Sequence, residues 1–269
     1  MDRRRRRRAG LMAERNERFE ALILRAKETP QGTRVVSILG GEAGLLDAFV
    51  FGGAKGGLRS SATPYVYATL AVYHDPVKNY RKVTDIQVLE SFSGLRTGYG
   101  KLMCAGAVAE TILKTHAAGG EYSRSLALAL DALRRMEGRA DEDSLLILLA
   151  FLWETLSLLG LDPDIGSCSG CGRPLPRDPR SQGFRLSRQM PGLACPSCDP
   201  EGRAFPTAML ETLDELKRRG MGACDSLALS DQGYRDLFDL VRGLARHATE
   251  DSLLSLSNGN FSSFFPGDF

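Results

Sequence analysis

Cys168-Ser-Gly-Cys171 and Cys195-Pro-Ser-Cys198 are the two short stretches from which the rest of this sequence is best interpreted. In each stretch two residues separate the cysteines, and 23 residues separate the two stretches. A tight turn lets both sulfurs of one CxxC reach a single ion, and two such turns complete a tetrahedron. The spacing therefore predicts one structural zinc ion per chain, bound by the thiolates of Cys168, Cys171, Cys195 and Cys198.

The region around these cysteines, residues 165–201, is predicted to be a zinc ribbon. It is rich in Gly and Pro, which favour turns, and it is expected to be too poor in apolar residues to build a core of its own. A bound metal would then stabilise it, and four cysteine ligands would leave no open position for a substrate. Three alternatives stay open: a pair of disulfides, a redox-active CxxC, and a ribbon that no longer binds metal.

Composition indicates an ordinary globular protein. The chain has 269 residues, of which 43% are hydrophobic and 25% are charged, and this length allows two domains. Only Cys104 and Cys224 lie outside the paired motif, a usage that fits a reducing cytoplasm. The longest uncharged apolar run, Leu145 to Trp153, is too short to span a bilayer.

The first eleven residues are expected to be a basic arm or a start-site artefact. No apolar segment of a signal peptide follows Arg3 to Arg8, and Met12 resembles a second start. These residues contribute six Arg and one Asp, so that without them the net charge changes from +2 to −3. Total charge therefore gives no support for nucleic-acid binding.

Residues 12–92 predict a small β-domain. Alternating or β-branched runs are separated by turns that contain Gly or Pro, and five strands in this length indicate a barrel of the OB type. An SH3-like barrel or a small sandwich would give a similar pattern. The predicted strands cover residues 18–28, 33–39, 44–51, 64–73 and 80–89.

Beyond Gly94 the apolar period changes to that of helices, which predicts a helical domain over residues 93–250. The third helix is apolar on nearly every side and is predicted to be the centre of a bundle. The three acids before it, Asp141 to Asp143, are interpreted as caps rather than catalytic carboxylates. The ribbon is inserted after this helix, and residues 251–269 are predicted to be a flexible tail. The predicted helices cover residues 97–118, 122–137, 145–159, 206–220 and 231–249.

Motifs of catalysis are missing from the sequence. The stretch Gly52-Gly-Ala-Lys55-Gly-Gly57 is no phosphate loop, because neither Ser nor Thr follows Lys55. No spacing suggests a Cys–His pair or a Ser–His–Asp triad. The sequence therefore predicts a protein that is not an enzyme and uses no nucleotide.

Cationic and aromatic side chains of the barrel predict a surface for nucleic acid. Residues 12–90 carry ten basic and nine acidic side chains, so this surface depends on how the charges segregate. The alternative is that the tyrosines are half-buried barrel residues and the charges a solvated face. The predicted DNA contacts are Arg25, Arg34, Lys55, Arg59, Lys78, Arg81 and Lys82, with Tyr65, Tyr67, Tyr73 and Tyr80 nearby.

Three stretches, in this order, resemble the RecO family of bacterial recombination mediators over residues 12–250. The first is Phe51-Gly-Gly-Ala-Lys-Gly-Gly-Leu-Arg-Ser-Ser61, and the second is Leu158-Leu-Gly-Leu-Asp-Pro-Asp164. The third joins Cys168-Ser-Gly-Cys171-Gly-Arg173 to Gly192-Leu-Ala-Cys195-Pro-Ser-Cys198.

The resemblance implies an OB-fold barrel and a helical domain that bind single- and double-stranded DNA and anneal complementary strands. It also implies that the protein acts together with RecR and with the acidic C-terminal tail of single-stranded DNA-binding protein. With these partners it would help RecA to load at gaps. By position it makes Lys55 and Arg59 part of a DNA-contacting loop. The clustered Arg134, Arg135 and Arg139 are predicted to hold the acidic tail, with a solvated helix face as the alternative.

Two features depart from the family. Its members often end in a basic helix and tail, whereas residues 204–269 carry six basic and ten acidic side chains, and the Arg-rich start is unusual. Two competing functions also stay open. One is a protein-interaction adaptor that uses the ribbon and does not bind DNA; the other is a nuclease or a redox enzyme that uses Cys168 and Cys171.

Overall fold

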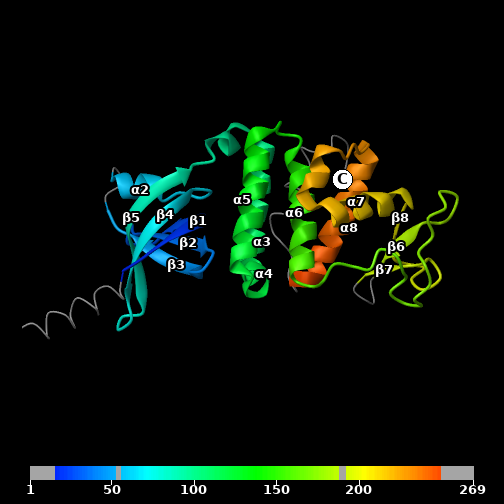
Figure 1. The fold of residues 1–269 in the computed structure, drawn as a ribbon, viewed down its shortest axis with the longest axis horizontal. Helices are drawn as coiled ribbons and strands as arrows, with labels where there is room; N and C mark the ends of the chain where they lie inside the picture. Colours follow the sequence, from blue (N-terminus) through cyan, green and yellow to red (C-terminus); the bar gives the residue numbers. More distant parts are fainter. Residues whose placement is uncertain (1–15, 53–55, 188–191, 250–269) are drawn as a thin grey trace, which may run out of the picture. The chain divides into compact units, whose positions relative to one another are not determined.

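The computed structural model describes residues 16–52, 56–187 and 192–249, and the side chains of these residues up to 246. The chain divides into two compact units (Figure 1). The first contains the residues up to Gly94 together with Gly120–Leu133, and the second contains Leu95–Gly119 and the residues from Arg134 onward. The predicted arm of residues 1–11 and tail of residues 251–269 lie outside the described residues, and the predicted domain boundary after residue 92 stays a prediction.

Five strands form the barrel of the first unit, as predicted. They close in the order β1-β2-β3-β5-β4, and β1 pairs with both β2 and β4. The pair β3–β5 is parallel, which excludes a simple meander and gives the five-stranded Greek-key arrangement of the OB type. The strands are β1 (Asn16–Glu28), β2 (Arg34–Gly40), β3 (Gly44–Val50), β4 (Tyr67–Asp75) and β5 (Tyr80–Glu90).

The barrel core follows from the alternation of side chains along each strand. Inward positions carry aliphatic residues, several of them alanines. A short helix that the sequence analysis did not predict, α2 (Gly57–Ser61), lies between β3 and β4, and Ala62 after it joins this core. The core residues are Ala21, Ile23, Val36, Ile38, Ala48, Val50, Ala62, Val66, Ala68, Leu70, Val72 and Val83.

The first turns of α5 (Tyr122–Gly138) belong to the same unit as the barrel. A Cβ atom built on Gly41 would lie 3.2 Å from the Ser123 hydroxyl, and one on Gly44 would lie 3.4 Å from the Tyr122 ring. Because Gly44 begins β3, these contacts place α5 against one end of that strand. The other end of β3 is six residues away, about 20 Å along an extended chain, and is free of this contact.

The second unit is organised around α6 (Ser144–Leu158), which is buried on nearly every side as predicted. It packs against α3 (Tyr99–Lys114), the 3-10 helix η2 (Gly220–Asp225), α7 (Ala208–Arg219) and α8 (Asp231–Thr249). The N–H groups of Gly100 and Lys101 at the start of α3 donate to the Asp141 carboxylate at 3.0 and 2.7 Å. The prediction of a cap was therefore right in kind, but Asp141 caps a helix some 40 residues earlier in the chain.

The boundaries of two predicted helices were wrong. The first helix was expected over residues 97–118, but Ser93–Thr97 forms the 3-10 helix η1 and α3 ends at Lys114. The next residues, in α4 (His116–Gly120), have positive φ angles, 50° at His116 and 53° at Ala117, so the right-handed helix cannot continue. Pro206 lies before the cap residue of α7 rather than in its first turn.

The cysteine region folds into a small sheet with the order β7-β6-β8, in which both pairs are antiparallel. Its strands are β6 (Phe184–Leu186), β7 (Leu193–Ala194) and β8 (Arg203–Phe205). Together with the barrel and the helices, this sheet gives the predicted α+β fold class. Among the described residues, no helix combines the length and the apolar composition that crossing a bilayer requires.

Candidate metal centre and nucleic-acid interface

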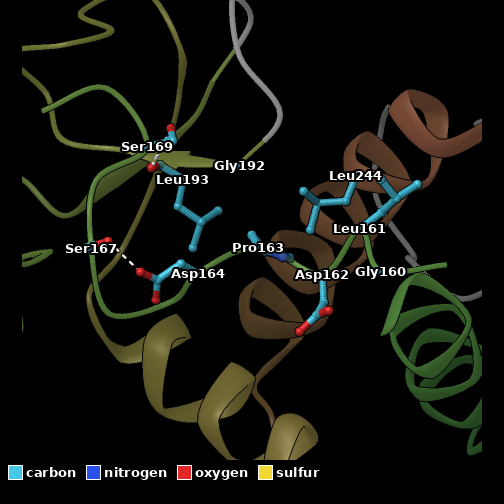
Figure 2. A pocket seen from close by; sticks show the side chains of 10 residues that line it. All are labelled: Gly160, Leu161, Asp162, Pro163, Asp164, Ser167, Ser169, Gly192, Leu193 and Leu244. Carbon is cyan, nitrogen blue, oxygen red and sulfur yellow. Dashed lines mark hydrogen bonds between the residues drawn. The ribbon is translucent and has the colours of Figure 1, made fainter. Parts of the chain in front are cut away.

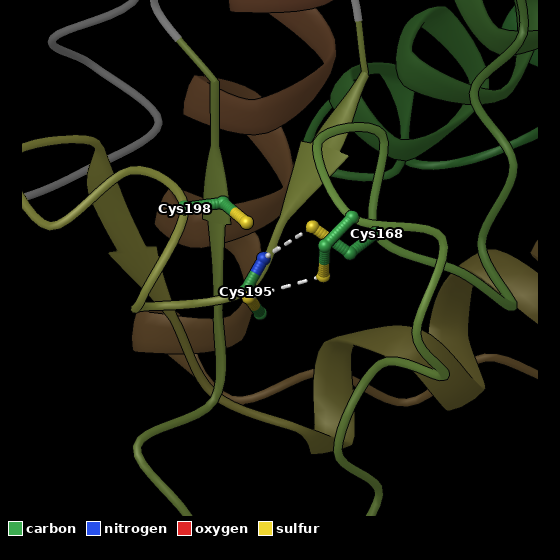
Figure 3. Close-up of side chains that lie close together, drawn as sticks. Cys168, Cys195 and Cys198 are labelled. Atoms are coloured by element: carbon green, nitrogen blue, oxygen red, sulfur yellow. Dashed lines mark hydrogen bonds between the residues drawn. The ribbon is translucent and has the colours of Figure 1, made fainter.

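The four cysteines predicted as metal ligands come together. One sulfur from each of Cys168, Cys171, Cys195 and Cys198 lies within 4.8 Å of the other three. Figure 3 shows Cys168 and Cys198 with their sulfurs turned towards each other and the Cys195 backbone next to them. Cys168 is buried, Cys171 is exposed, and the other two are half-buried. These positions match the donor set of a tetrahedral four-thiolate site.

Tight turns hold the sulfurs in place. The Cys168 carbonyl accepts from Gly172 N–H at 2.8 Å, and the Cys195 carbonyl accepts from Cys198 N–H at 3.0 Å. Gly172 has a φ of 70°, which a residue with a Cβ rarely adopts. Two further N–H groups, of Cys195 and Gly170, donate to the Cys168 sulfur at 3.2 and 3.4 Å. The sequence therefore builds each CxxC as a turn whose amides face a sulfur.

The thiols of the cluster differ in their acidity. Burial raises the pKa of Cys168, but the backbone N–H groups of Cys195, Cys171 and Gly170 outweigh it and bring the pKa down to about 6. The side chains of Cys195, Cys171 and Cys168, which hydrogen-bond with Cys198, raise its pKa to about 12. Four thiolates this close cannot all ionise without an added positive charge, which a divalent metal supplies.

Arg173 supplies positive charge at the edge of the cluster. Its backbone N–H and its guanidinium lower the pKa of Cys171, and the pKa of Arg173 is raised by its hydrogen bond to the Cys171 sulfur. An arginine in this position stabilises the net negative charge that four thiolates and one divalent ion leave.

One expectation about the ribbon was wrong. The segment was thought unable to form a core, yet Phe184 and Phe205 are buried and stack with their ring centroids 5.6 Å apart. Leu175 and Leu193 are buried with 3% and 1% of their surface exposed. The core was missed because Phe205 lies outside the residues 165–201 that were assigned to the ribbon. Apolar packing therefore contributes to the stability of the ribbon, in addition to any metal that the cysteines bind.

The geometry favours metal over the disulfide alternative. The sulfurs of Cys171 and Cys195 are 3.9 Å apart, whereas a disulfide bond needs about 2.05 Å. All six cysteines are free thiols, and Cys104 and Cys224 are buried away from the cluster. The four-cysteine cluster is thus a metal site in its donor chemistry.

A pocket of about 320 Å³ lies beside the ribbon (Figure 2). Leu161, Leu193 and Leu244 form its apolar wall, and Asp162 and Asp164 lie at its edge. Both carboxylates have partners: Asp162 pairs with Lys217 at 3.9 Å, and Asp164 accepts from Ser167 and from Gly166 N–H. The Ser167 hydrogen bond is the first cause of the lowered pKa of Asp164. The residues that line this pocket include no cation for a phosphate and no nucleophile–base pair.

Two of the predicted DNA contacts, Arg34 and Arg59, lie together on one side of the barrel. Glu28 accepts from Arg34 at 2.8 Å and from Arg59 at 2.5 Å, and the Arg34 hydrogen bond is the first cause of the lowered pKa of Glu28. Arg34 also donates to the Arg59 and Ala62 carbonyls at 2.7 and 3.1 Å. Both guanidiniums therefore hold the segment after β3 against the barrel, in addition to any contact with DNA.

The other predicted cations are distributed over the barrel. Lys78 is exposed at the turn between β4 and β5, where its N–H donates to the Asp75 carboxylate at 3.1 Å. Arg81 and Lys82 follow on β5 and are half-buried, and Arg25 on β1 is exposed and donates to Ser37 at 3.3 Å. Lys55 lies outside the described residues.

The aromatic side chains next to these cations were only partly anticipated. The four candidate tyrosines are half-buried, in line with the alternative interpretation, although Tyr80 lies edge-on to Phe49 with centroids 6.2 Å apart. The sequence analysis missed Phe49 and Phe51, which stack with centroids 6.0 Å apart. Phe51 is 45% exposed, and the Lys82 ammonium lies 5.4 Å from the centre of its ring. The sequence signal that could have identified Phe51 is an aromatic residue at the end of a predicted strand, directly before a Gly-rich loop.

Of the three arginines predicted to bind an acidic partner, two come together. Asp225 accepts from Arg135 at 3.2 Å and also from Arg139, which donates to the Cys224 carbonyl at 2.9 Å as well. Burial raises the pKa of Asp225, but the two guanidiniums outweigh it and the pKa is lowered. Arg134 is exposed and points elsewhere on the helix, because consecutive helical residues are about 100° apart.

Comparison with known proteins finds one family over most of the chain. The family model described as Recombination protein O C terminal matches residues 96–257. The DNA repair protein RecO of Desulforudis audaxviator (strain MP104C) is 26% identical over 242 residues, which are 88% of this chain and 94% of the relative. RecO of Anaeromyxobacter sp. (strain K) is 26% identical over 238 residues, 86% of this chain and 90% of the relative.

A third relative, RecO of Symbiobacterium thermophilum, is 23% identical over 199 residues, 74% of this chain and 78% of the relative. The family model covers more than half of the chain, and these relatives extend the similarity over the barrel. The similarity to one family thus covers both the barrel and the helices with the four-cysteine cluster. The chain belongs to the RecO family of DNA repair proteins, whose members are recombination mediators and not enzymes.

Proposed function

We propose that this protein binds single- and double-stranded DNA through its barrel and anneals complementary strands in the bacterial cytoplasm, at the nucleoid. With RecR it helps to load RecA on gaps coated by single-stranded DNA-binding protein. Membership of the RecO family supports the role in repair, and the charge distribution on the barrel supports the contact with DNA.

One observation carries the proposal: cations from three separate elements gather at the loop after β3. Arg59 of α2 donates to the Gly52 carbonyl at 3.4 Å, Arg34 of β2 donates to the Arg59 carbonyl, and Lys82 of β5 lies over the Phe51 ring. The predicted contact Lys55 belongs to this same loop in the sequence. Cations held in one place attract phosphates without a further ordering cost.

Annealing needs no nucleotide hydrolysis in this scheme. Two DNA strands repel one another through their phosphates, and cationic side chains reduce that repulsion. Base pairing then supplies the free energy. The barrel is nearly neutral in total, so the attraction depends on where its cations lie. Arg34 and Arg59 share the Glu28 carboxylate, and Lys82, Lys78 and Arg81 on the β4–β5 hairpin add positive charge.

For the acidic tail of single-stranded DNA-binding protein we propose Arg135 and Arg139 as the contact. Both guanidiniums already converge on one carboxylate, that of Asp225, whose side chain is 47% exposed. A carboxylate of the tail would replace Asp225 or share the two guanidiniums with it. Arg134, on another side of the helix, would be a secondary contact.

We infer that the metal is zinc, one per chain and structural. Four thiolates in tetrahedral reach of one another are the usual donor set of structural zinc and leave no position for a substrate. Its role is to stabilise the cysteine-containing segment between α6 and α7. Because this segment is not part of the barrel, we expect the barrel to keep its affinity for DNA when the metal site is lost.

The DNA contact predicts a specific loss of affinity. Replacing Lys78 and Arg81 together by Ala should weaken binding of a single-stranded oligonucleotide by about tenfold at 0.1 M salt, because two phosphate contacts disappear. The slope of log affinity against log salt should fall by about 1.4. Fluorescence anisotropy over a salt series measures both quantities.

The matched control replaces Arg124 and Arg218 by Ala. Their side chains are 68% and 70% exposed, and the loss of charge is the same, so binding should change by less than about twofold if position matters. Equal losses in the two double variants would show that only net charge matters. No DNA binding by the unaltered protein would favour the protein-interaction adaptor instead.

A further inference from the structure

An aromatic cluster lies on the outer surface of the barrel, where β3 and β5 meet. It consists of Phe49, Phe51, Tyr80 and Lys82, and we call these four residues the Phe51 platform. The Cα partner of Phe49 is Lys82, and the next pair joins Val50 to Val83. Phe49 stacks on Phe51 and meets Tyr80 edge to face. The platform therefore crosses the parallel seam that closes the barrel.

Alternation along the strands turns the platform outward. Ala48 and Val50 are 1% and 0% exposed and belong to the barrel core, so Phe49 between them faces the other way. Val83 is fully buried, which places its neighbour Lys82 on the outer surface as well. The platform also lies at the end of β3 opposite to the turn that contacts α5.

Packing does not explain the exposed ring of Phe51. The side chain is 45% exposed and is not part of the barrel core, so its removal leaves no buried cavity. A large exposed aromatic residue contributes little to stability in water and is common where ring faces take part in binding. Its neighbours include a ring at 6.0 Å and an ammonium at 5.4 Å.

This combination is suited to unpaired bases. Every base has a π-face that stacks on an aromatic ring, whereas the bases of a duplex are already stacked on one another. Lys82 next to the ring and Lys78 and Arg81 on the same hairpin supply charge for the phosphates that flank a stacked base. Asp75 in the same turn, whose carboxylate accepts from two N–H groups, contributes one negative charge against these three cations.

We propose that the Phe51 platform stacks unpaired bases of single-stranded DNA and thereby makes the barrel prefer single strands to duplex. This inference rests on the proposed DNA-binding function and adds the residue and the chemical group that distinguish the two forms of DNA. Contacts to phosphates alone would not distinguish a strand that carries bases from an abasic strand of the same charge.

The test uses the full-length protein and three labelled probes of about 20 nucleotides: oligothymidylate, an abasic oligonucleotide of the same charge, and a blunt duplex. Phe51→Ala should weaken binding of oligothymidylate by about tenfold and change binding of the abasic strand by less than twofold. The control Leu89→Ala, on β5 and exposed to a similar extent at 43%, should change neither. Anisotropy titrations give these affinities.

A second variant reports on stacking directly. Phe51→Trp keeps a stacking surface and should retain the affinity for oligothymidylate. The natural Trp153 is fully buried, so quenching of the new tryptophan by oligothymidylate, and not by the abasic strand, would support stacking.

Three results would overturn the inference. Equal affinity of the unaltered protein for oligothymidylate and the abasic strand would show that bases are not contacted. Equal weakening of all three probes by Phe51→Ala would assign Phe51 a structural role. Binding to none of the probes would remove the proposed function itself, which separates that failure from failure of the platform.

Discussion

Replacing Cys168 by Ser is expected to release the metal and to unfold the ribbon. Cys168 is the most buried of the four ligands, and two backbone N–H groups donate to its sulfur. A serine hydroxyl is a poor zinc ligand, and the three remaining thiols lose the cation that allows them to ionise together. The second unit should lose at least about 3 kcal/mol of stability, since metal binding and folding are coupled. Metal analysis and thermal unfolding measure the effect.

DNA binding should respond much less. The barrel belongs to the other compact unit, so affinity for a single-stranded oligonucleotide should stay within about twofold at temperatures where the variant remains soluble. Cys224→Ala is the control: it removes a buried thiol outside the cluster and should keep one metal ion per chain. A Cys168→Ser protein with a full complement of metal and unchanged unfolding would contradict the four-thiolate assignment.

Gly183→Ala is expected to have a similarly large effect, for steric reasons. Gly183 precedes β6 and has a φ of 66°, and a Cβ atom there would lie 2.0 Å from the Phe205 carbonyl oxygen. A backbone atom cannot move aside as a side chain can, so β6 and β8 would have to separate and expose the stacked Phe184 and Phe205. We expect a loss of at least about 3 kcal/mol and weaker metal retention.

Denaturant unfolding with zinc in excess, and competition with a chromogenic chelator, measure these two quantities. Gly138→Ala is the matched control in the same unit, because no atom lies within 4 Å of the added Cβ and φ is not positive. That variant should be neutral or slightly stabilised. Two variants of equal stability would show that β6 and β8 tolerate a different register.

The metal site and the strands could be predicted because their signals are local. Two CxxC pairs at this spacing bring four sulfurs together in few ways, and the structure places them within 4.8 Å of one another. Alternation in residues 64–73 likewise requires one buried face, which Ala68, Leu70 and Val72 form. The barrel order was harder to predict, since five strands can close in several ways and the parallel β3–β5 pair joins residues more than 30 apart.

Contacts between distant residues limited the prediction of the DNA interface. An arginine in a Gly-rich loop has the same sequence pattern whether it is free or held, and only the fold shows that Glu28 binds both Arg34 and Arg59. Asp141 was placed at the nearest helix because caps are usually local, whereas its partners lie some 40 residues away. The sequence does not show that the ring of Phe51 is 45% exposed, because this depends on the parallel pairing of β3 with β5.

The most direct test of the central claim is the annealing of two complementary labelled oligonucleotides, followed by energy transfer without ATP. At low salt the protein should accelerate annealing by at least about tenfold, and high salt should abolish the acceleration, because cations of the barrel must hold both strands. Annealing at the uncatalysed rate at low salt, with folded and metal-loaded protein, would contradict the account.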